Sequence, residues 1–150
     1  MEDHALEPSS RRRVSKKPSS LGAAEDLPPP AFPVVGVGAS AGGLEAFTEL
    51  LRHLPADTDM AFVLVQHLDP THASLLVELL ASKTSMSLVE ARDGMPVTPN
   101  AVYVVPPAKD MVIEQATLRL TPRLTAGMHL PIDSFLQSLA RDRGSAAVAV

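Results

Sequence analysis

The sequence predicts an α/β domain with a doubly wound, mainly parallel sheet, flanking helices, a short antiparallel section and a truncated C-terminus. Two observations carry this prediction. From Pro33 onward, short apolar runs alternate with segments in which apolar residues recur at helical spacing, as in strand-helix-strand units. A hydrophobic content of 45% and a charged content of 20% in 150 residues are typical of one globular domain with a core.

The first half of this domain predicts strand, helix, strand and helix in that order. Apolar runs at 34–37 and 61–65 indicate two buried strands. Apolar residues between them recur at spacings of three and four, as on one face of a helix that Pro55 ends: Leu44, Phe47, Leu51 and Leu54. Leucines after the second strand predict the apolar face of a second helix: Leu75, Leu76, Leu79 and Leu80.

Shorter strand-like segments follow, and turn sequences separate them. The segments are 87–91, 102–105, 111–114 and 117–121. The intervening turns contain Asp93-Gly94, Pro99-Asn100 and Pro106-Pro107. Such short spacing favours some antiparallel pairing in this part of the chain.

A third helix is predicted from Pro131, since proline suits the first position of a helix and Asp133 suits its positive end. Its inward face is expected to carry Ile132, Phe135, Leu136 and Leu139. The apolar run at 146–150 then resembles one more buried strand, with no turn after it. We interpret this end as a truncation, so that the domain over 33–150 continues beyond Val150.

Composition excludes several function classes. A formal net charge of -4 gives no reason to expect nucleic acid as a partner, and the absence of cysteine excludes thiol nucleophiles and thiolate zinc sites. No apolar run approaches the roughly 20 residues of a membrane span, and no secretory signal is evident, so a cytoplasmic protein is predicted. Residues 1–32 are rich in Ser, Pro and charge and are interpreted as a flexible arm without an assigned function.

Ser40 is the first candidate catalytic residue. It lies in Gly38-Ala39-Ser40-Ala41-Gly42, where the first strand gives way to the first helix, so a serine can be presented there on a sharp turn. Ala41 and Gly42, at the helix start, are the candidate oxyanion and nucleophile-loop residues. The competing interpretation is that Ser40 merely caps the helix, and on this motif alone capping is favoured.

His67 is the candidate general base. It follows the second predicted strand, and a right-handed strand-helix-strand unit brings the carboxyl ends of both strands to one edge of the sheet. Ser40 and His67 are therefore expected to face one crevice. His53 and His129 have ordinary structural explanations, and His72 gains no such support.

Two other site types are weighed and set aside. Gly36-Val37-Gly38-Ala39-Ser40-Ala41 fits a permissive dinucleotide-binding pattern, but the second strand ends in Gln66-His67 and not in an acidic residue. His67, Asp69 and His72 could be drawn as a metal cluster, but Pro70 interrupts any shared helix face and no fourth ligand is evident. No metal and no cofactor are predicted.

With Val35 to Gly43, Val65-Gln66-His67, Asp93-Gly94, Val102 to Pro106 and Pro131-Ile132-Asp133, the chain resembles the catalytic domain of chemotaxis protein-glutamate methylesterases (CheB-type). The resemblance runs from about Pro33 to the end. It implies a doubly wound domain that hydrolyses glutamate methyl esters on chemoreceptors with a serine, a histidine and a later aspartate. Ser40 and His67 match the first two of these residues.

The resemblance leaves the acid of this triad without a match, because the family's aspartate follows the strand at which this chain ends. The available carboxylates are Asp69, Asp93, Asp110 and Asp133, and none is assigned. The 150-residue chain alone is therefore expected to be inactive, as loss of a triad acid can cost roughly 10⁴-fold in turnover. It is also expected to be poorly stable, because the missing strands would expose a sheet edge.

The expected partner is a methylated chemoreceptor or another signalling protein. The Gln66 to Pro70 segment is similar to esterase domains fused to methyltransferase and sensor-kinase modules, so such modules are possible neighbours. The arm leaves no room for the receiver domain of stand-alone members. A degenerate interaction module of a multi-domain sensor is the alternative function, and a dinucleotide-binding domain is the third.

Overall fold

The computed structural model describes residues 32–40, 42–66, 74–123 and 130–150. Within them, parallel strands form a five-stranded sheet in the order β3-β5-β2-β1-β8, and a three-stranded antiparallel sheet has the order β4-β7-β6. The strands are β1 (Val34–Ala39), β2 (Ala61–Gln66), β3 (Ser87–Glu90), β4 (Met95–Pro96), β5 (Ala101–Val104), β6 (Lys109–Glu114), β7 (Thr117–Pro122) and β8 (Ala147–Ala149). The helices are α1 (Gly43–His53), α2 (Ser74–Ala81), α3 (Pro131–Arg143) and the short 3-10 helix η1 (Gly144–Ala146).

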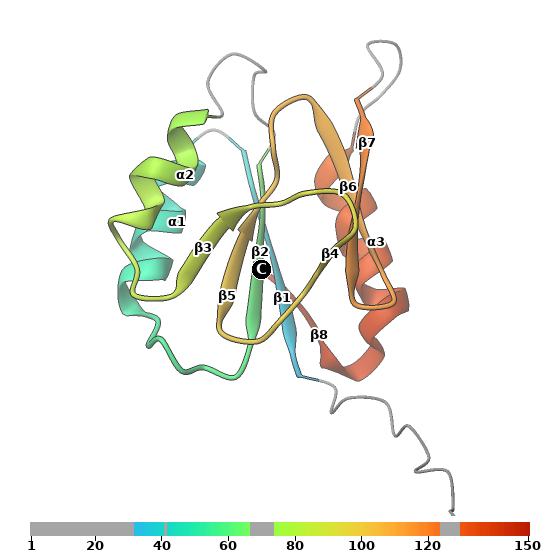
Figure 1. Ribbon diagram of the computed structural model, residues 1–150, viewed down its shortest axis with the longest axis horizontal. Helices are drawn as coiled ribbons and strands as arrows, with labels where there is room; N and C mark the ends of the chain where they lie inside the picture. The colour runs from blue at the N-terminus through green and yellow to red at the C-terminus, as the bar shows by residue number, and fades with distance from the viewer. Residues whose placement is uncertain (1–31, 41, 67–73, 124–129) are drawn as a thin grey trace, which may run out of the picture.

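Helices cover both faces of the parallel sheet (Figure 1). α1 and α2 pack on one face, where Phe47, Leu51, Leu76 and Leu80 share a core with one set of strand residues. α3 and the antiparallel sheet pack on the opposite face, around Phe135 and other fully buried side chains. The predicted doubly wound α/β fold with a short antiparallel section is confirmed.

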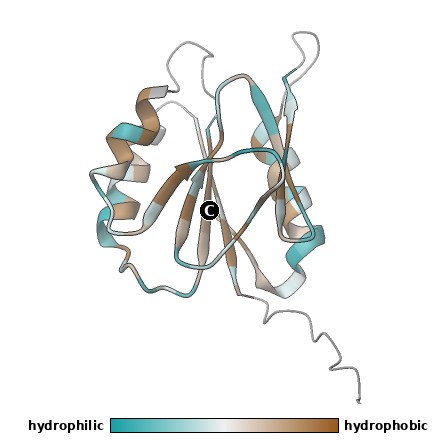
Figure 2. Cartoon of the chain, viewed as in Figure 1, coloured by the Kyte–Doolittle hydropathy of each residue, from teal (hydrophilic) through white to brown (hydrophobic). Residues whose placement is uncertain are grey.

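The central strands are apolar because both of their faces are covered. Every residue of β2 is buried, and Figure 2 shows the strands of the parallel sheet coloured mostly as hydrophobic. Alternate residues of such a strand enter different cores: Phe62 and Leu64 face α1 and α2, whereas Val63 and Val65 face α3. The continuous apolar run at 61–65 is thus explained by its central place in the sheet.

Helix α1 forms where the sequence predicts it. Phe47 and Leu51 are each 1% exposed, Glu45 lies in the first turn, and Arg52 and His53 lie in the last, where their charges suit the helix dipole. Leu54 has an extended backbone, as expected for the residue before a proline, so the helix ends at His53.

Helix α3 runs along β1 and packs closely against it. Pro131 is its first residue and Asp133 lies in its first turn, as predicted. A Cβ atom added to Gly38 would lie 2.5 Å from Cγ2 of Ile132, and one added to Gly36 would lie 2.7 Å from Cδ2 of Leu136. These two glycines therefore allow the helix to approach the strand.

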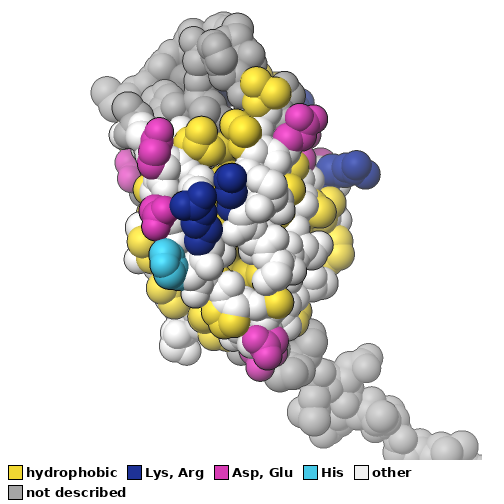
Figure 3. Space-filling model, turned by 90° about the vertical axis from the view of Figure 1, so that its left-hand side faces the viewer, with side chains coloured by type: hydrophobic (Ala, Val, Ile, Leu, Met, Phe, Trp, Pro, Cys, Tyr) yellow, Lys and Arg dark blue, Asp and Glu magenta, His cyan; other side chains and the backbone are white. Residues whose placement is uncertain are grey.

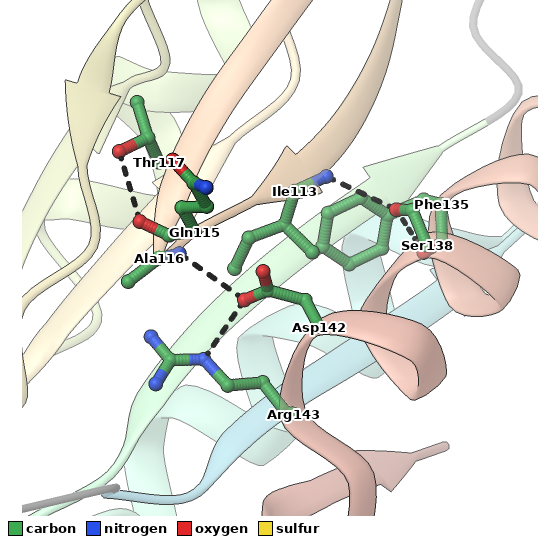
Figure 4. A network of polar contacts seen from close by, with 8 residues as sticks. All are labelled: Ile113, Gln115, Ala116, Thr117, Phe135, Ser138, Asp142 and Arg143. Atoms are coloured by element: carbon green, nitrogen blue, oxygen red, sulfur yellow. Dashed lines mark hydrogen bonds and ion pairs between the residues drawn. The ribbon is translucent and has the colours of Figure 1, made fainter. Parts of the chain in front are cut away.

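The C-terminal half of α3 is tied to the β6–β7 hairpin by polar contacts (Figure 4). Asp142 accepts a hydrogen bond of 3.2 Å from the backbone N–H of Ala116 and lies 3.3 Å from Nε of Arg143. Ser138 accepts one of 3.0 Å from the N–H of Ile113 and donates one of 2.7 Å to the carbonyl of Phe135. The antiparallel sheet is thereby fixed against the helix.

Two predictions about burial are wrong. Leu76 and Leu80 of α2 are buried, but Leu75 and Leu79 are 56% and 48% exposed, because four leucines at these spacings cover more than the one stripe that faces the sheet. Hydrophobic side chains remain visible among charged ones on the face formed by α1 and α2 (Figure 3). β8 is a strand as predicted, but it lies at the edge of the described sheet, where Val148 and Val150 are exposed and not buried as expected.

Candidate active site

Ser40 directly follows β1 at the carboxyl edge of the parallel sheet. β1 and β2 are paired in parallel, and Ala39, the last residue of β1, is the register partner of Gln66, the last residue of β2. Both strands therefore end at the same level, and Ser40 is exposed there. His67, the next residue after Gln66, lies outside the described residues, as do Ala41, Asp69 and His72.

Gly42, and not Ser40, caps helix α1. Its backbone is left-handed, with φ 85° and ψ 2°, and within the described residues no side-chain capping hydrogen bond is made at this helix start. The capping interpretation of Ser40 is therefore wrong, because the N-cap position lies two residues later.

The Ser40 backbone is held through its carbonyl group. This carbonyl accepts a hydrogen bond of 3.1 Å from the N–H of Gly43 and one of 3.3 Å from Nε2 of Gln66. The first contact comes from the start of α1 and the second from the end of β2. The turn that carries Ser40 is thus attached to both neighbouring elements.

Gln66 is the polar member of the described core. It is 9% exposed and is the one polar residue among the buried residues of the described chain. By strand alternation its side chain follows Phe62 and Leu64 on the face covered by α1. Its Oε1 atom is buried and has no hydrogen-bond partner among the described residues.

Sequence reasoning missed Gln66 as a site residue. A signal was present, because a glutamine continues the inward positions of an otherwise apolar buried strand, where a polar side chain is costly unless it is paired. Its contact with Ser40, however, depends on the register of β1 against β2, which the sequence pattern did not fix.

Three of the carboxylates weighed from the sequence lie within the described residues. Asp93 accepts a hydrogen bond of 2.9 Å from the N–H of Leu120, and Asp110 forms an ion pair of 3.3 Å with Arg123. Asp133 lies exposed in the first turn of α3. None of these three is brought to Ser40 as an orienting acid by a contact within the described chain.

The glycines of the dinucleotide-like pattern have a packing role. Gly36 and Gly38 face side chains of α3, so their small size is explained by the approach of the helix. This removes the main support for a dinucleotide-binding loop. Gly43 is likewise required for close packing, because an added Cβ would lie 2.8 Å from Cβ of Ala39 and 3.0 Å from Nε2 of Gln66.

A surface depression of about 270 Å³ lies elsewhere, between α3 and the end of β6, with Glu114, Ser138 and Asp142 among its lining residues. Ile132, at the start of α3, meets Gly38, whereas Arg143, at its end, lies over the ring of Phe32 before β1. The depression, beside the end of α3, is thus at the opposite end of β1 from Ser40. Across the described ranges no group of three potential metal ligands occurs, and no helix there is long and apolar enough to cross a bilayer.

Comparison with known proteins identifies the domain. Residues 35–150 match the family model described as CheB methylesterase. The chain belongs to the CheB methylesterase family. The resemblance seen in the sequence motifs is confirmed.

Relatives of this CheB methylesterase domain are longer proteins. One from Xanthomonas oryzae pv. oryzae, named protein-glutamate methylesterase/protein-glutamine glutaminase 2, is 35% identical over 120 residues, which cover 77% of this chain and 33% of the relative. One from Bradyrhizobium diazoefficiens, named protein-glutamate methylesterase/protein-glutamine glutaminase of group 3 operon, is 30% identical over 158 residues, with coverage of 97% and 43%. The chain spans about a third of the Xanthomonas relative.

The solved structure of the Thermotoga maritima CheB methylesterase catalytic domain has the same fold. It superposes with a TM-score of 0.68 at 24% sequence identity and covers 79% of this chain and 65% of that chain. This likeness agrees with the parallel sheet and flanking helices of the CheB domain described above.

Proposed function

We propose that this domain hydrolyses methyl esters of glutamate side chains on a methylated chemoreceptor or a similar signalling protein. Ser40 acts as the nucleophile and His67 as the general base. The relatives are named protein-glutamate methylesterases, which supports this reaction class.

The reaction follows the chemistry of a serine esterase. His67 takes the proton of the Ser40 hydroxyl as its oxygen attacks the ester carbonyl. The tetrahedral intermediate collapses, the C–O bond to the methoxy group breaks, and methanol leaves with that proton. Water, activated by His67, then cleaves the acyl-serine and releases glutamate and free Ser40.

The position of Ser40 is the observation that carries the proposal. It is exposed directly after a buried parallel strand, at the edge where ligands bind in open α/β sheets. Because Gly42 is the N-cap residue of α1, Ser40 does not occupy the capping position. His67 follows Gln66, the register partner of Ala39, which favours its approach to Ser40.

Ala41 and Gly42 are proposed to form the loop that stabilises the oxyanion, since the start of a helix offers backbone N–H groups and a positive dipole end. The orienting aspartate stays a prediction, expected after Val150 by resemblance to the family. No cofactor or metal takes part in the proposed reaction.

The test is methanol release by the full-length protein from a receptor whose glutamate methyl groups carry tritium. Replacing the nucleophile of a serine hydrolase lowers kcat by roughly 10⁴- to 10⁶-fold, so we expect Ser40→Ala to abolish measurable release. Ser87→Ala is the matched control, because Ser87 is exposed at the amino end of β3, on the opposite edge of the sheet, and should keep full activity.

The degenerate interaction module is the competing proposal. It predicts no methanol release from the folded wild-type protein, and equal behaviour of the wild type and Ser40→Ala. Equal release from both proteins would also refute Ser40 as nucleophile.

A further inference from the structure

We propose that Gln66 is a positioning residue, which fixes the turn that carries Ser40 to the point where the chain leaves β2. This inference rests on the proposed function of Ser40 and deepens it. Gln66 does not touch the reacting atoms, and its effect is exerted through the Ser40 backbone.

The Ser40 carbonyl is held by hydrogen bonds from two different elements. A carbonyl oxygen has two lone pairs, and here it receives two donors, the N–H of Gly43 at 3.1 Å and Nε2 of Gln66 at 3.3 Å. Gly43 belongs to the same turn and moves with it. Gln66 supplies the contact from the neighbouring strand, so it anchors the peptide plane of Ser40 to the sheet.

Packing around the glutamine amide supports the same role. A Cβ atom on Gly43 would lie 3.0 Å from Nε2 and 3.1 Å from Cδ of Gln66, so the amide lies close against the first residue of α1. Gly43 itself is buried. The amide is therefore confined between the end of β2 and the start of α1, where it has little freedom to release Ser40.

Stability alone does not explain a glutamine at this position. Its neighbours on the same face of β2 are Phe62 and Leu64, and its buried Oε1 atom has no hydrogen-bond partner in the described part of the chain. A buried acceptor without a partner destabilises a fold, and an apolar side chain of similar volume would avoid this cost. Residues that do not suit their local environment, such as an incompletely paired polar side chain in a core, occur mainly at functional sites.

Gln66 directly precedes the candidate base in the chain, so its contact with Ser40 bears on how the nucleophile and the base are placed relative to each other. His67 is the next residue, so the side chain that holds the Ser40 carbonyl belongs to the residue that leads into the candidate base. Loss of the contact is expected to loosen the proposed nucleophile relative to the proposed base. A misplacement of about 1 Å can cost roughly 100-fold in rate.

The experiment compares Gln66→Met with Leu64→Met in the full-length protein. Both changes introduce methionine on the same face of β2, but Leu64 does not contact Ser40. For Gln66→Met we expect kcat for methanol release to fall roughly 10- to 100-fold with KM nearly unchanged, while Tm stays equal or rises. Leu64→Met should keep the wild-type kcat.

Gln66→Glu tests the donor separately. It keeps the size of the side chain, and at a pH where the new carboxyl group is ionised it cannot donate to the Ser40 carbonyl. A reduced kcat in both Gln66 variants supports the inference. Wild-type kcat in Gln66→Met, or an equal loss in Leu64→Met, overturns it.

Amide hydrogen exchange gives a readout that does not depend on catalysis. If Gln66 anchors the turn, the Gly43 amide exchanges faster in Gln66→Met, while amides inside β1 are unchanged. Unchanged exchange at Gly43 overturns the inference. A wild-type protein that releases no methanol would refute the proposed function, and the exchange result would still decide whether Gln66 anchors this turn.

Discussion

Gly42 and Gly43 shape the turn after Ser40 for two different physical reasons. Gly42 has the left-handed backbone that ends the strand-to-helix turn, and an added Cβ there would have open space around it. Gly43 has no positive φ but lies against Ala39 and Gln66, where a Cβ would clash. The first glycine is needed for its conformation and the second for its size.

Replacement of Gly42 should therefore destabilise the fold through backbone strain and not through a steric clash. We expect Gly42→Ala to lower the free energy of unfolding by about 1 kcal/mol, because an alanine in the left-handed region is strained. Gly42→Asn should lose less, since asparagine tolerates this region better. Urea unfolding of the variants measures both values, and an alanine variant as stable as the wild type would contradict the expected strain.

Strand β1 and helix α3 are in close contact on one face of the sheet. The two glycines of β1 on that face, Gly36 and Gly38, stand opposite branched side chains of α3. Larger residues at these places would move the helix away from the sheet. The helix also holds the antiparallel sheet through Ser138 and Asp142, so such a movement would reach β6 and β7.

The contact between Gly38 and Ile132 can be tested as a pair. Gly38→Ala should lower the free energy of unfolding by about 1–3 kcal/mol, because its Cβ overlaps Cγ2 of Ile132 at 2.5 Å. Ile132→Ala removes that atom, so the double variant should lose less than the sum of the two single losses. Denaturant unfolding of all four proteins measures the coupling, and strictly additive losses would contradict the proposed overlap.

Elements whose buried residues recur at regular spacing could be predicted from the sequence. Short elements and elements at the edge of a sheet could not. α1 and α3 could be predicted because their buried residues recur at helical spacing and prolines mark the end of one and the start of the other. β4 is a two-residue strand that exists only through its pairing with β7, so no local pattern announces it. The exposure of β8 depends on what lies beside it, which a run of apolar residues does not encode.

The candidate site, like the fold, could be predicted only where it depends on local sequence. Ser40 was found because it lies at a strand-to-helix boundary, which the sequence locates well. The capping alternative could not be dismissed from the motif, since it depends on where the left-handed residue falls. Gln66 was missed because its partner is in another strand.

The whole molecule is built around one sheet that separates two cores. Phe47, Leu51 and Leu80 belong to the core on one side, and Leu118 and Phe135 to the core on the other. The strands β1, β2 and β5 contribute residues to both cores. Loss of either core should therefore unfold the common sheet.

Truncation of a buried leucine in either core should lower stability without uncoupling the two sides. Leu118 and Leu80 are both 0% exposed, so we expect Leu118→Ala and Leu80→Ala each to cost about 2–5 kcal/mol. Far-UV circular dichroism and the fluorescence of Tyr103 should report one transition with the same midpoint. Separate midpoints for the two signals in either variant would contradict a shared sheet.

The pairing of β8 with β1 also bears on how the chain is made. β1 is the first strand of the described chain, and its partner on one side, β8, is the last. While the ribosome adds the residues between them, one row of β1 backbone groups lacks this partner, and contacts between distant segments form slowly. Nascent chains of this domain are therefore expected to present an open strand edge, the kind of surface that aggregates unless a chaperone covers it.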